Sequence, residues 1–162
     1  MGDGPVVIGY DGSPAARRAV REAGALLSVA SALVVVVWEA GKAFDLMEVP
    51  ALGLDLPPAG LDVRTAFAVD EAMYDQAQQL ARQGAALARE AGFETAEGLA
   101  VADELTVSDT LVRVAREQDA PALVVGSHGH TALGELLVGS TSRGVLRHAG
   151  RPVVVVRQTE AR

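Results

Sequence analysis

The chain has no cysteine, so disulfides, thiolate nucleophiles and cysteine metal sites are excluded. It also lacks any apolar run near the roughly 20 residues that a membrane helix requires. Its first five residues carry neither the basic nor the apolar region of a secretory signal. We therefore expect a cytoplasmic protein with no membrane partner.

Positive charge is scarce as well. Lys and Arg total 14 against 21 Asp and Glu, and the net charge is −7. The field of the whole molecule repels polyanions, so we expect no nucleic-acid partner. A small anion can still bind where backbone N–H groups converge, because that attraction is local. The 162 residues, 49% of them apolar, suffice for one domain with a two-sided core.

Short valine-rich runs without alternation predict strands that are buried on both faces of a parallel sheet. They span 6–8, 33–37, 123–125 and 153–156, with a weaker candidate at 95–101. Helical periodicity lies between them, at about 14–30, 70–91, 108–118 and 141–149. The order β-α-β-α-β-α-β-α-β predicts the α/β class: one domain, 1–162, with a doubly wound open five-stranded parallel sheet and helices on both faces.

Residues 39–69 lack clear periodicity and carry three prolines. This is long for a structureless connection, and it predicts a long loop that is either a lid or a partly disordered insert.

Glycines lie at both ends of the segment from 126 to 142. Gly126 and Gly129 follow a buried strand, and Gly139 precedes a predicted helix that opens with Ser140, Thr141 and Ser142. Glycines let backbone N–H groups approach an anion, and the helix start adds free N–H groups, a favourable dipole and three hydroxyl donors. The pattern favours a phosphate site, and the alternative is that the glycines form ordinary turns and Ser140 is an N-cap.

Asp11 directly follows the first predicted strand, which places its carboxylate at the switch point of a doubly wound sheet. It could accept hydrogen bonds from ribose hydroxyls or hold a metal's water, or it could close an Asx-turn, and these roles can coexist. Trp38 could stack on a base or pack under the long loop, and packing is favoured. Arg143 could reach a phosphate or face water. His128 and His130 lack further ligands at metal spacing, so we predict neither a metal site nor a catalytic role.

The string Gly126-x-x-Gly129-x9-Gly139-Ser140 resembles the nucleotide-binding signature of the universal stress protein family, and residues 7–13 and 150–156 agree. The resemblance implies an ATP-binding member that forms a homodimer through its last strand. It implies that the triphosphate is held by Gly126, Gly129, Gly139, Ser140 and Thr141, with Asp11 by the ribose or phosphates and the backbone of Val37 at adenine.

One stretch departs from the family pattern. Many binders carry a glycine–proline turn after the third strand, where this chain has Asp103 and Glu104. Acidic side chains that pointed into the cleft would weaken phosphate binding or make a divalent cation essential, and Mg²⁺ held by the phosphates is the expected ion.

The sequence favours a nucleotide-dependent regulatory or stress-response module with a protein partner that it does not identify. The alternative is a phosphoryl-transfer enzyme that hydrolyses ATP slowly. No Gly-Lys-Ser/Thr motif is present, and the only lysine, Lys42, lies in the long loop, so binding is better supported than turnover. A flavin or nicotinamide carrier is disfavoured because no G-x-G-x-x-G follows the first strand.

Overall fold

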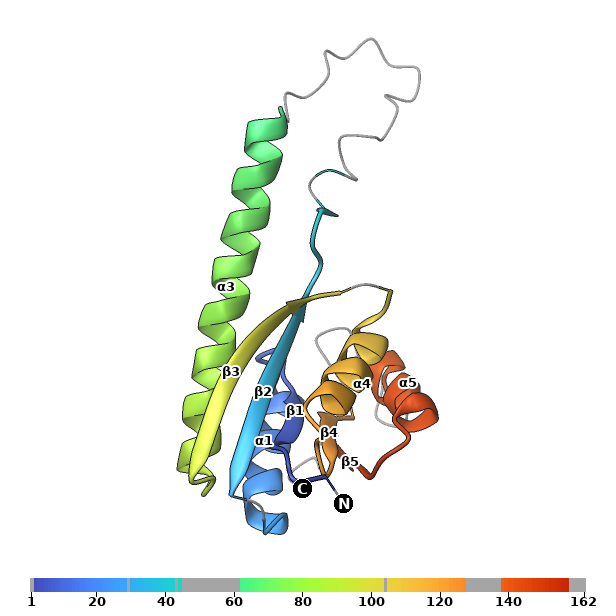
Figure 1. Ribbon diagram of the computed structural model, residues 1–162. Helices are drawn as coiled ribbons and strands as arrows, with labels where there is room; N and C mark the ends of the chain where they lie inside the picture. Colours follow the sequence, from blue (N-terminus) through green and yellow to red (C-terminus); the bar gives the residue numbers. More distant parts are fainter. Residues whose placement is uncertain are drawn as a thin grey trace, which may run out of the picture.

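The computed structural model describes residues 2–28, 30–42, 44, 62–103, 105–127 and 138–157. Strands and helices alternate along these residues in the predicted order (Figure 1). The elements are β1 (Val6–Gly9), α1 (Pro14–Leu26), β2 (Ser31–Trp38), α3 (Val63–Glu90), β3 (Thr95–Ala102), α4 (Val107–Glu117), β4 (Leu123–Gly126), α5 (Ser140–His148) and β5 (Val153–Val156).

The strands form one parallel sheet in the order β3-β2-β1-β4-β5. The chain builds outward from β1 to β3 and then crosses back through α4 to place β4 on the other side of β1. Ile8 of β1 is therefore in register with Val34 of β2 and with Val124 of β4. The predicted doubly wound five-stranded sheet is confirmed, and its switch point lies between β1 and β4.

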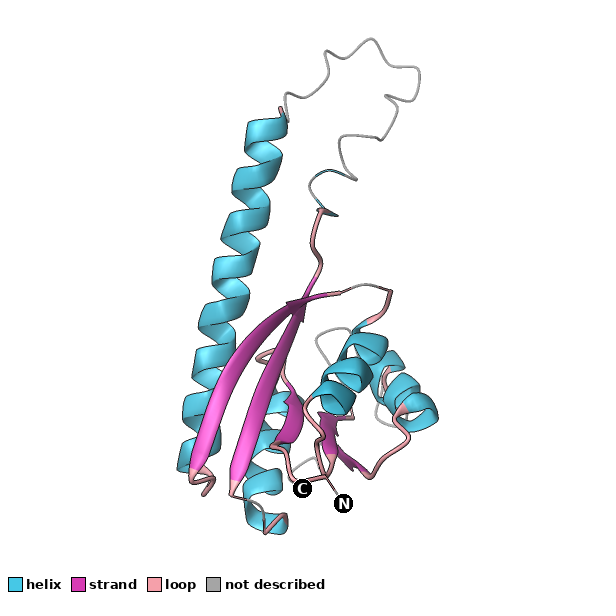
Figure 2. Cartoon of the chain, in the orientation of Figure 1, coloured by secondary structure: helices cyan, strands magenta, loops and turns pink. Residues whose placement is uncertain are grey.

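Helices cover both faces of the sheet (Figure 2). Val6 and Ile8 pack with α1 and α3, whereas Val7 packs with α4 and α5, and all three side chains are fully buried. Since successive strand residues face opposite sides, this two-sided burial explains why the strands read as continuous apolar runs.

Two helix boundaries differ from prediction. The long helix α3 begins at Val63 and not at Asp70, because the Asp62 carboxylate caps it by accepting a hydrogen bond from the N–H of Thr65 at 2.8 Å. Residues 63–69 of the predicted loop are therefore helical, while 45–61 lie outside the described residues. Helix α1 ends at Leu26 and not near residue 30, because Leu27 is extended, with φ −100° and ψ 116°.

Candidate functional site

The carboxyl ends of β1 and β4 lie side by side at one edge of the sheet. The chain leaves the sheet there after each of the two strands. After β1 comes the segment Tyr10–Ser13, and after β4 comes Ser127. The pairing of these two strands brings Asp11 and Gly126 to the same edge, and β2 ends beside them with Val37 and Trp38. Gly129, His128 and His130 lie outside the described residues.

The turn after β1 is organised by its own side chains. Asp11 Oδ1 accepts a hydrogen bond from the N–H of Ser13 at 2.9 Å, which is the Asx-turn that the sequence offered as one role of this residue. Gly12 has a φ of 76°, a conformation that favours glycine. Ser13 Oγ then caps α1 by accepting from the N–H of Ala16 at 3.1 Å. Asp11 is thus half-buried and held at the edge of the sheet.

The two ends of the predicted phosphate loop are joined by hydrogen bonds. The N–H of Gly139 donates to the carbonyl of Ser127 at 2.7 Å, and the Ser142 hydroxyl donates to the carbonyl of Gly126 at 2.6 Å. The N–H of Ser127 in turn donates to the carbonyl of Val156 in β5 at 2.8 Å. These bonds hold the start of α5 against the end of β4.

The N-terminus of α5 carries no side-chain cap. Gly139 is the N-cap, so Ser140 is the first helical residue and not the cap that the alternative interpretation assigned to it. The first helical bond runs from the N–H of Arg143 to the carbonyl of Gly139 at 3.0 Å. The N–H groups of Ser140 and Thr141 make no hydrogen bond to another described residue. By contrast, hydroxyls or carboxylates cap α1, α3 and α4.

Ser142 does not serve as the predicted phosphate donor. Its side chain is buried, with 2% of its surface exposed, and its hydroxyl proton is committed to Gly126. Ser140 is exposed and Thr141 is half-buried, so these two retain the position that the sequence analysis proposed for them.

Gly126 has a packing role that the sequence analysis missed. A Cβ on this residue would lie 2.9 Å from the carbonyl carbon of Ala15 in the first turn of α1. Any side chain would therefore push α1 away from β4, so glycine permits close contact between the two turns that border the site. The sequence signal for this contact was the small residue Ala15, directly after Pro14 at the start of α1.

Val37 presents backbone groups at the same edge. The carbonyl of Val35 accepts a hydrogen bond from the N–H of Tyr10 at 2.8 Å on the β1 side. The carbonyl of Trp38 accepts one from the N–H of Asp103 at 2.9 Å on the β3 side. Because alternate residues of a strand direct their backbone groups to the same neighbour, Val37 points its N–H and C=O toward the β1 side, beyond the last residue of β1.

Trp38 has the packing role that the sequence analysis favoured. The Trp38 ring packs against Tyr74 of α3 with ring centroids 5.8 Å apart, and this supports packing over base stacking. Arg143 is exposed, and Asp103 is half-buried. Glu104 lies outside the described residues. Within the described ranges, no group of three His, Asp or Glu residues could hold a metal ion, and no helix has the length and apolarity to span a bilayer.

The fold is a doubly wound α/β sheet, and the start of α5 at its switch point has no side-chain cap. Proteins of this class bind their ligands at the carboxyl edge of the sheet. The model of the universal stress protein family matches residues 4–157, and the chain belongs to this family.

Individual relatives agree with this assignment. Universal stress protein MJ0577 of Methanocaldococcus jannaschii is 33% identical over 64 residues, which span 38% of this chain and only 40% of that relative. The solved structure of MJ0577 has the same fold, with a TM-score of 0.74 over 99% of this chain and 100% of that one, at 17% identity.

Two further solved structures are complexes with nucleotides. A universal stress protein in complex with cAMP has a TM-score of 0.62 and 25% identity, over 98% of this chain and 100% of that one. The universal stress protein of Archaeoglobus fulgidus in complex with dAMP has a TM-score of 0.60 and 21% identity, over 96% and 99%.

Proposed function

We propose that this chain binds ATP at the carboxyl edge between β1 and β4 and acts as a nucleotide-dependent regulatory module. The observation that carries the proposal is the start of α5, where two successive N–H groups have no partner among the described residues and are held against the end of β4. Such a helix start favours phosphate oxygens through its N–H groups and its dipole.

The proposed contacts follow the layout of this edge. Gly139, Ser140 and Thr141 would bind the phosphates together with the loop that Gly126 and Gly129 begin. Asp11 would accept a hydrogen bond from the ribose or act through Mg²⁺ held by the phosphates. The relatives in complex with cAMP and dAMP bind adenine nucleotides, and this supports adenine as the base.

Adenine would meet the backbone of Val37. Its N–H and C=O form a neighbouring donor and acceptor, a pair that suits the N1 and N6 edge of adenine and mismatches guanine. Nucleotide specificity would then come from main-chain groups whose orientation is set by the strand register.

A binding role fits this edge better than rapid turnover. A hydrolytic enzyme needs a positioned base or water-orienting group near the γ-phosphate. The described residues of this edge offer backbone donors and hydroxyls, with Asp11 engaged in its own turn. Bound ATP would instead shift the population of surface states that a protein partner recognises.

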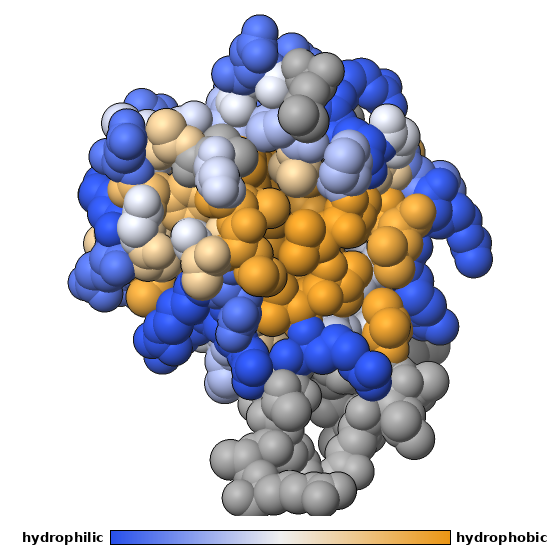
Figure 3. Space-filling model, turned by 90° about the horizontal axis from the view of Figure 1, so that it is seen from below, coloured by the Kyte–Doolittle hydropathy of each residue, from blue (hydrophilic) through white to orange (hydrophobic). Residues whose placement is uncertain are grey.

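We also propose a homodimer through β5. This strand pairs with β4 and with no other described strand, and Val153, Val154 and Val155 are only half-buried. The view of the molecule from below shows an apolar patch with hydrophilic residues around it (Figure 3). Pairing β5 with its symmetry mate would satisfy the backbone groups of the edge and cover these valines.

Mass spectrometry of the nucleotide retained by the purified protein tests the ligand, followed by calorimetric titration of the stripped protein with ATP and GTP. We expect ATP to be retained and to bind at least tenfold more tightly than GTP. Equal affinity for the two nucleotides would contradict the assignment of Val37, and binding of neither would contradict the site.

A further inference from the structure

Helix α3 is longer than the sheet that it covers. It has 28 residues, and its second half packs on β2 and β3, where Gly98 lets the backbone of Ala81 approach so closely that a Cβ would lie 2.4 Å from it. Its first half continues past the carboxyl edge of the sheet (Figure 1). This projecting half is not used by the proposed nucleotide site.

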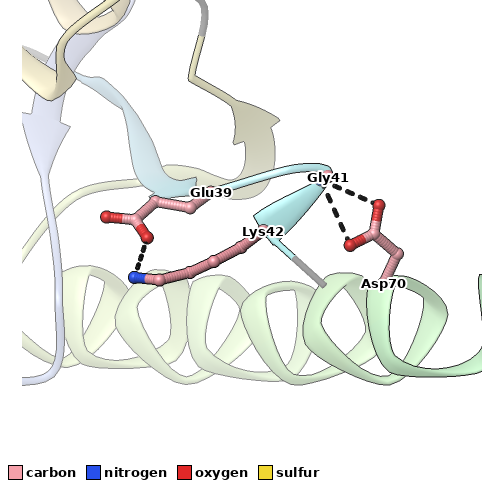
Figure 4. Close-up of polar contacts among 4 residues, drawn as sticks. All are labelled: Glu39, Gly41, Lys42 and Asp70. Carbon is pink, nitrogen blue, oxygen red and sulfur yellow. Dashed lines mark hydrogen bonds and ion pairs between the residues drawn. The ribbon is translucent and has the colours of Figure 1, made fainter. Parts of the chain in front are cut away.

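The segment that follows β2 runs alongside this projecting half in the opposite direction. Trp38 packs on Tyr74, and Phe44 packs edge-on against Phe67 with ring centroids 5.1 Å apart. Between them, the N–H of Gly41 donates to both carboxylate oxygens of Asp70, at 2.9 and 3.1 Å (Figure 4). We call residues 38–42, 44 and 62–76 the arm.

The arm exposes large apolar side chains on one side of the helix. Val63, Phe67 and Tyr74 have exposed fractions of 54%, 63% and 41%. Their spacing of four and seven residues places them on one face, and Ala81, seven residues further on, is fully buried on the same face against the sheet. The core-facing stripe of α3 thus continues beyond the core, where it leaves an apolar surface.

The charges around this apolar surface indicate which kind of partner could bind it. The arm carries five carboxylates and two basic groups, a net charge of −3. One of the basic groups, Lys42, is paired with Glu39 (Figure 4). Glu71 and Asp75 are exposed, lie one turn apart and flank the apolar face. Two such arms would repel each other, whereas a basic amphipathic helix would match both the apolar face and the charge.

We propose that the arm is the docking surface for a basic amphipathic helix of a protein partner. Phe67, Val63 and Tyr74 would receive its apolar face, and Glu71 and Asp75 would pair with its Lys or Arg side chains. The second half of α3 packs on β2 and β3, at the opposite edge of the sheet from β5. A dimer formed through β5 would therefore leave the arm, which continues from this half of α3, accessible. The inference does not rest on nucleotide binding, and docking is expected with and without ATP.

The probe is a fluorescein-labelled helical peptide of about 18 residues, roughly 27 Å long, built from leucine on one face and lysine on the other. Its binding is followed by anisotropy and by the emission of Trp38, the only tryptophan. We expect Phe67→Ser, and separately the double variant Glu71→Lys/Asp75→Lys, to weaken binding at least tenfold. Circular dichroism checks that each variant is folded.

Matched controls separate docking from general attraction to an acidic protein. Glu90→Lys/Glu94→Lys changes the net charge by the same amount at exposed positions away from the arm, and Leu146→Ser removes an apolar side chain that is 54% exposed on α5. Both should bind the peptide like the native protein. The proposal is overturned if the controls weaken binding as much as the arm variants, or if a peptide with glutamate in place of lysine binds equally well. Self-association that Phe67→Ser abolishes, without any binding of the basic peptide, would overturn it in favour of a second copy.

Discussion

Replacing Ser142 by alanine tests how the candidate site is held together. The hydroxyl is almost fully buried and donates at 2.6 Å to the carbonyl of Gly126. The variant removes this bond and leaves a carbonyl without its hydrogen-bond donor, which costs about 1–3 kcal/mol of unfolding free energy. For a chain of this size, roughly 2–4 °C of Tm is lost for each kcal/mol.

The matched control is Ser140→Ala, two residues earlier in the same helix. Ser140 is exposed, and its hydroxyl has no hydrogen-bond partner among the described residues, so its loss should change the unfolding free energy by less than about 0.5 kcal/mol. If Ser140 contacts phosphate, the same variant should weaken ATP binding by about threefold to tenfold, corresponding to a hydrogen bond of about 0.6–1.4 kcal/mol.

The two variants therefore separate stability from affinity. Urea unfolding of the nucleotide-free protein gives the first quantity, and calorimetric titration with ATP gives the second. If Ser142→Ala unfolds with the native free energy, or if Ser140→Ala destabilises the fold more than Ser142→Ala does, the buried hydrogen bond to Gly126 does not hold the site together.

Four further predictions concern the site, the dimer, the reaction and a helix cap. Gly139→Val should abolish ATP binding by calorimetry yet leave the fold intact by circular dichroism, because φ −58° and ψ 162° are accessible to valine. Native affinity in that variant would contradict the loop assignment. Val154→Lys should shift the dimer toward monomer in light scattering, and a native protein that is monomeric at tens of micromolar would rule out the β5 interface. Turnover of ATP with magnesium should stay below about one per second in a phosphate-release assay, and a faster rate would indicate an enzyme. Hydrogen bonds from Thr65 lower the pKa of Asp62 in the folded protein. The cap therefore stabilises α3 fully above the pKa of Asp62 in the unfolded chain, about 3.9. This stabilisation is lost as the pH falls through the lower pKa of the folded state. Denaturant unfolding against pH should show this slope in the native protein and less of it in Asp62→Asn, and identical slopes would contradict it.

The order of elements and the two-sided sheet could be predicted from the sequence because they depend on local signals. Strands that are buried on both faces must be apolar at nearly every position, as in Val6–Ile8. The Ser13–Pro14 start of α1 is equally local, since the cap bonds a backbone group three residues away. The glycine–serine spacing from 126 to 140 likewise identified the region that the fold brings to the switch point.

Other features depend on contacts between segments that are far apart in the chain, and periodicity does not report these. The burial of Ser142 against Gly126 depends on how α5 seats on β4, so its hydroxyl could not be told apart from that of Ser140 in the sequence. The need for glycine at 126 arises from the backbone of Ala15, more than a hundred residues away. The direction in which the N–H and C=O of Val37 point depends on the register of β2 with β1. The sequence alone therefore determined which segments build the sheet and the loop, whereas the tertiary contacts decided which of their donors remain available to a ligand, because a polar group that is bonded inside the fold cannot also bind a phosphate.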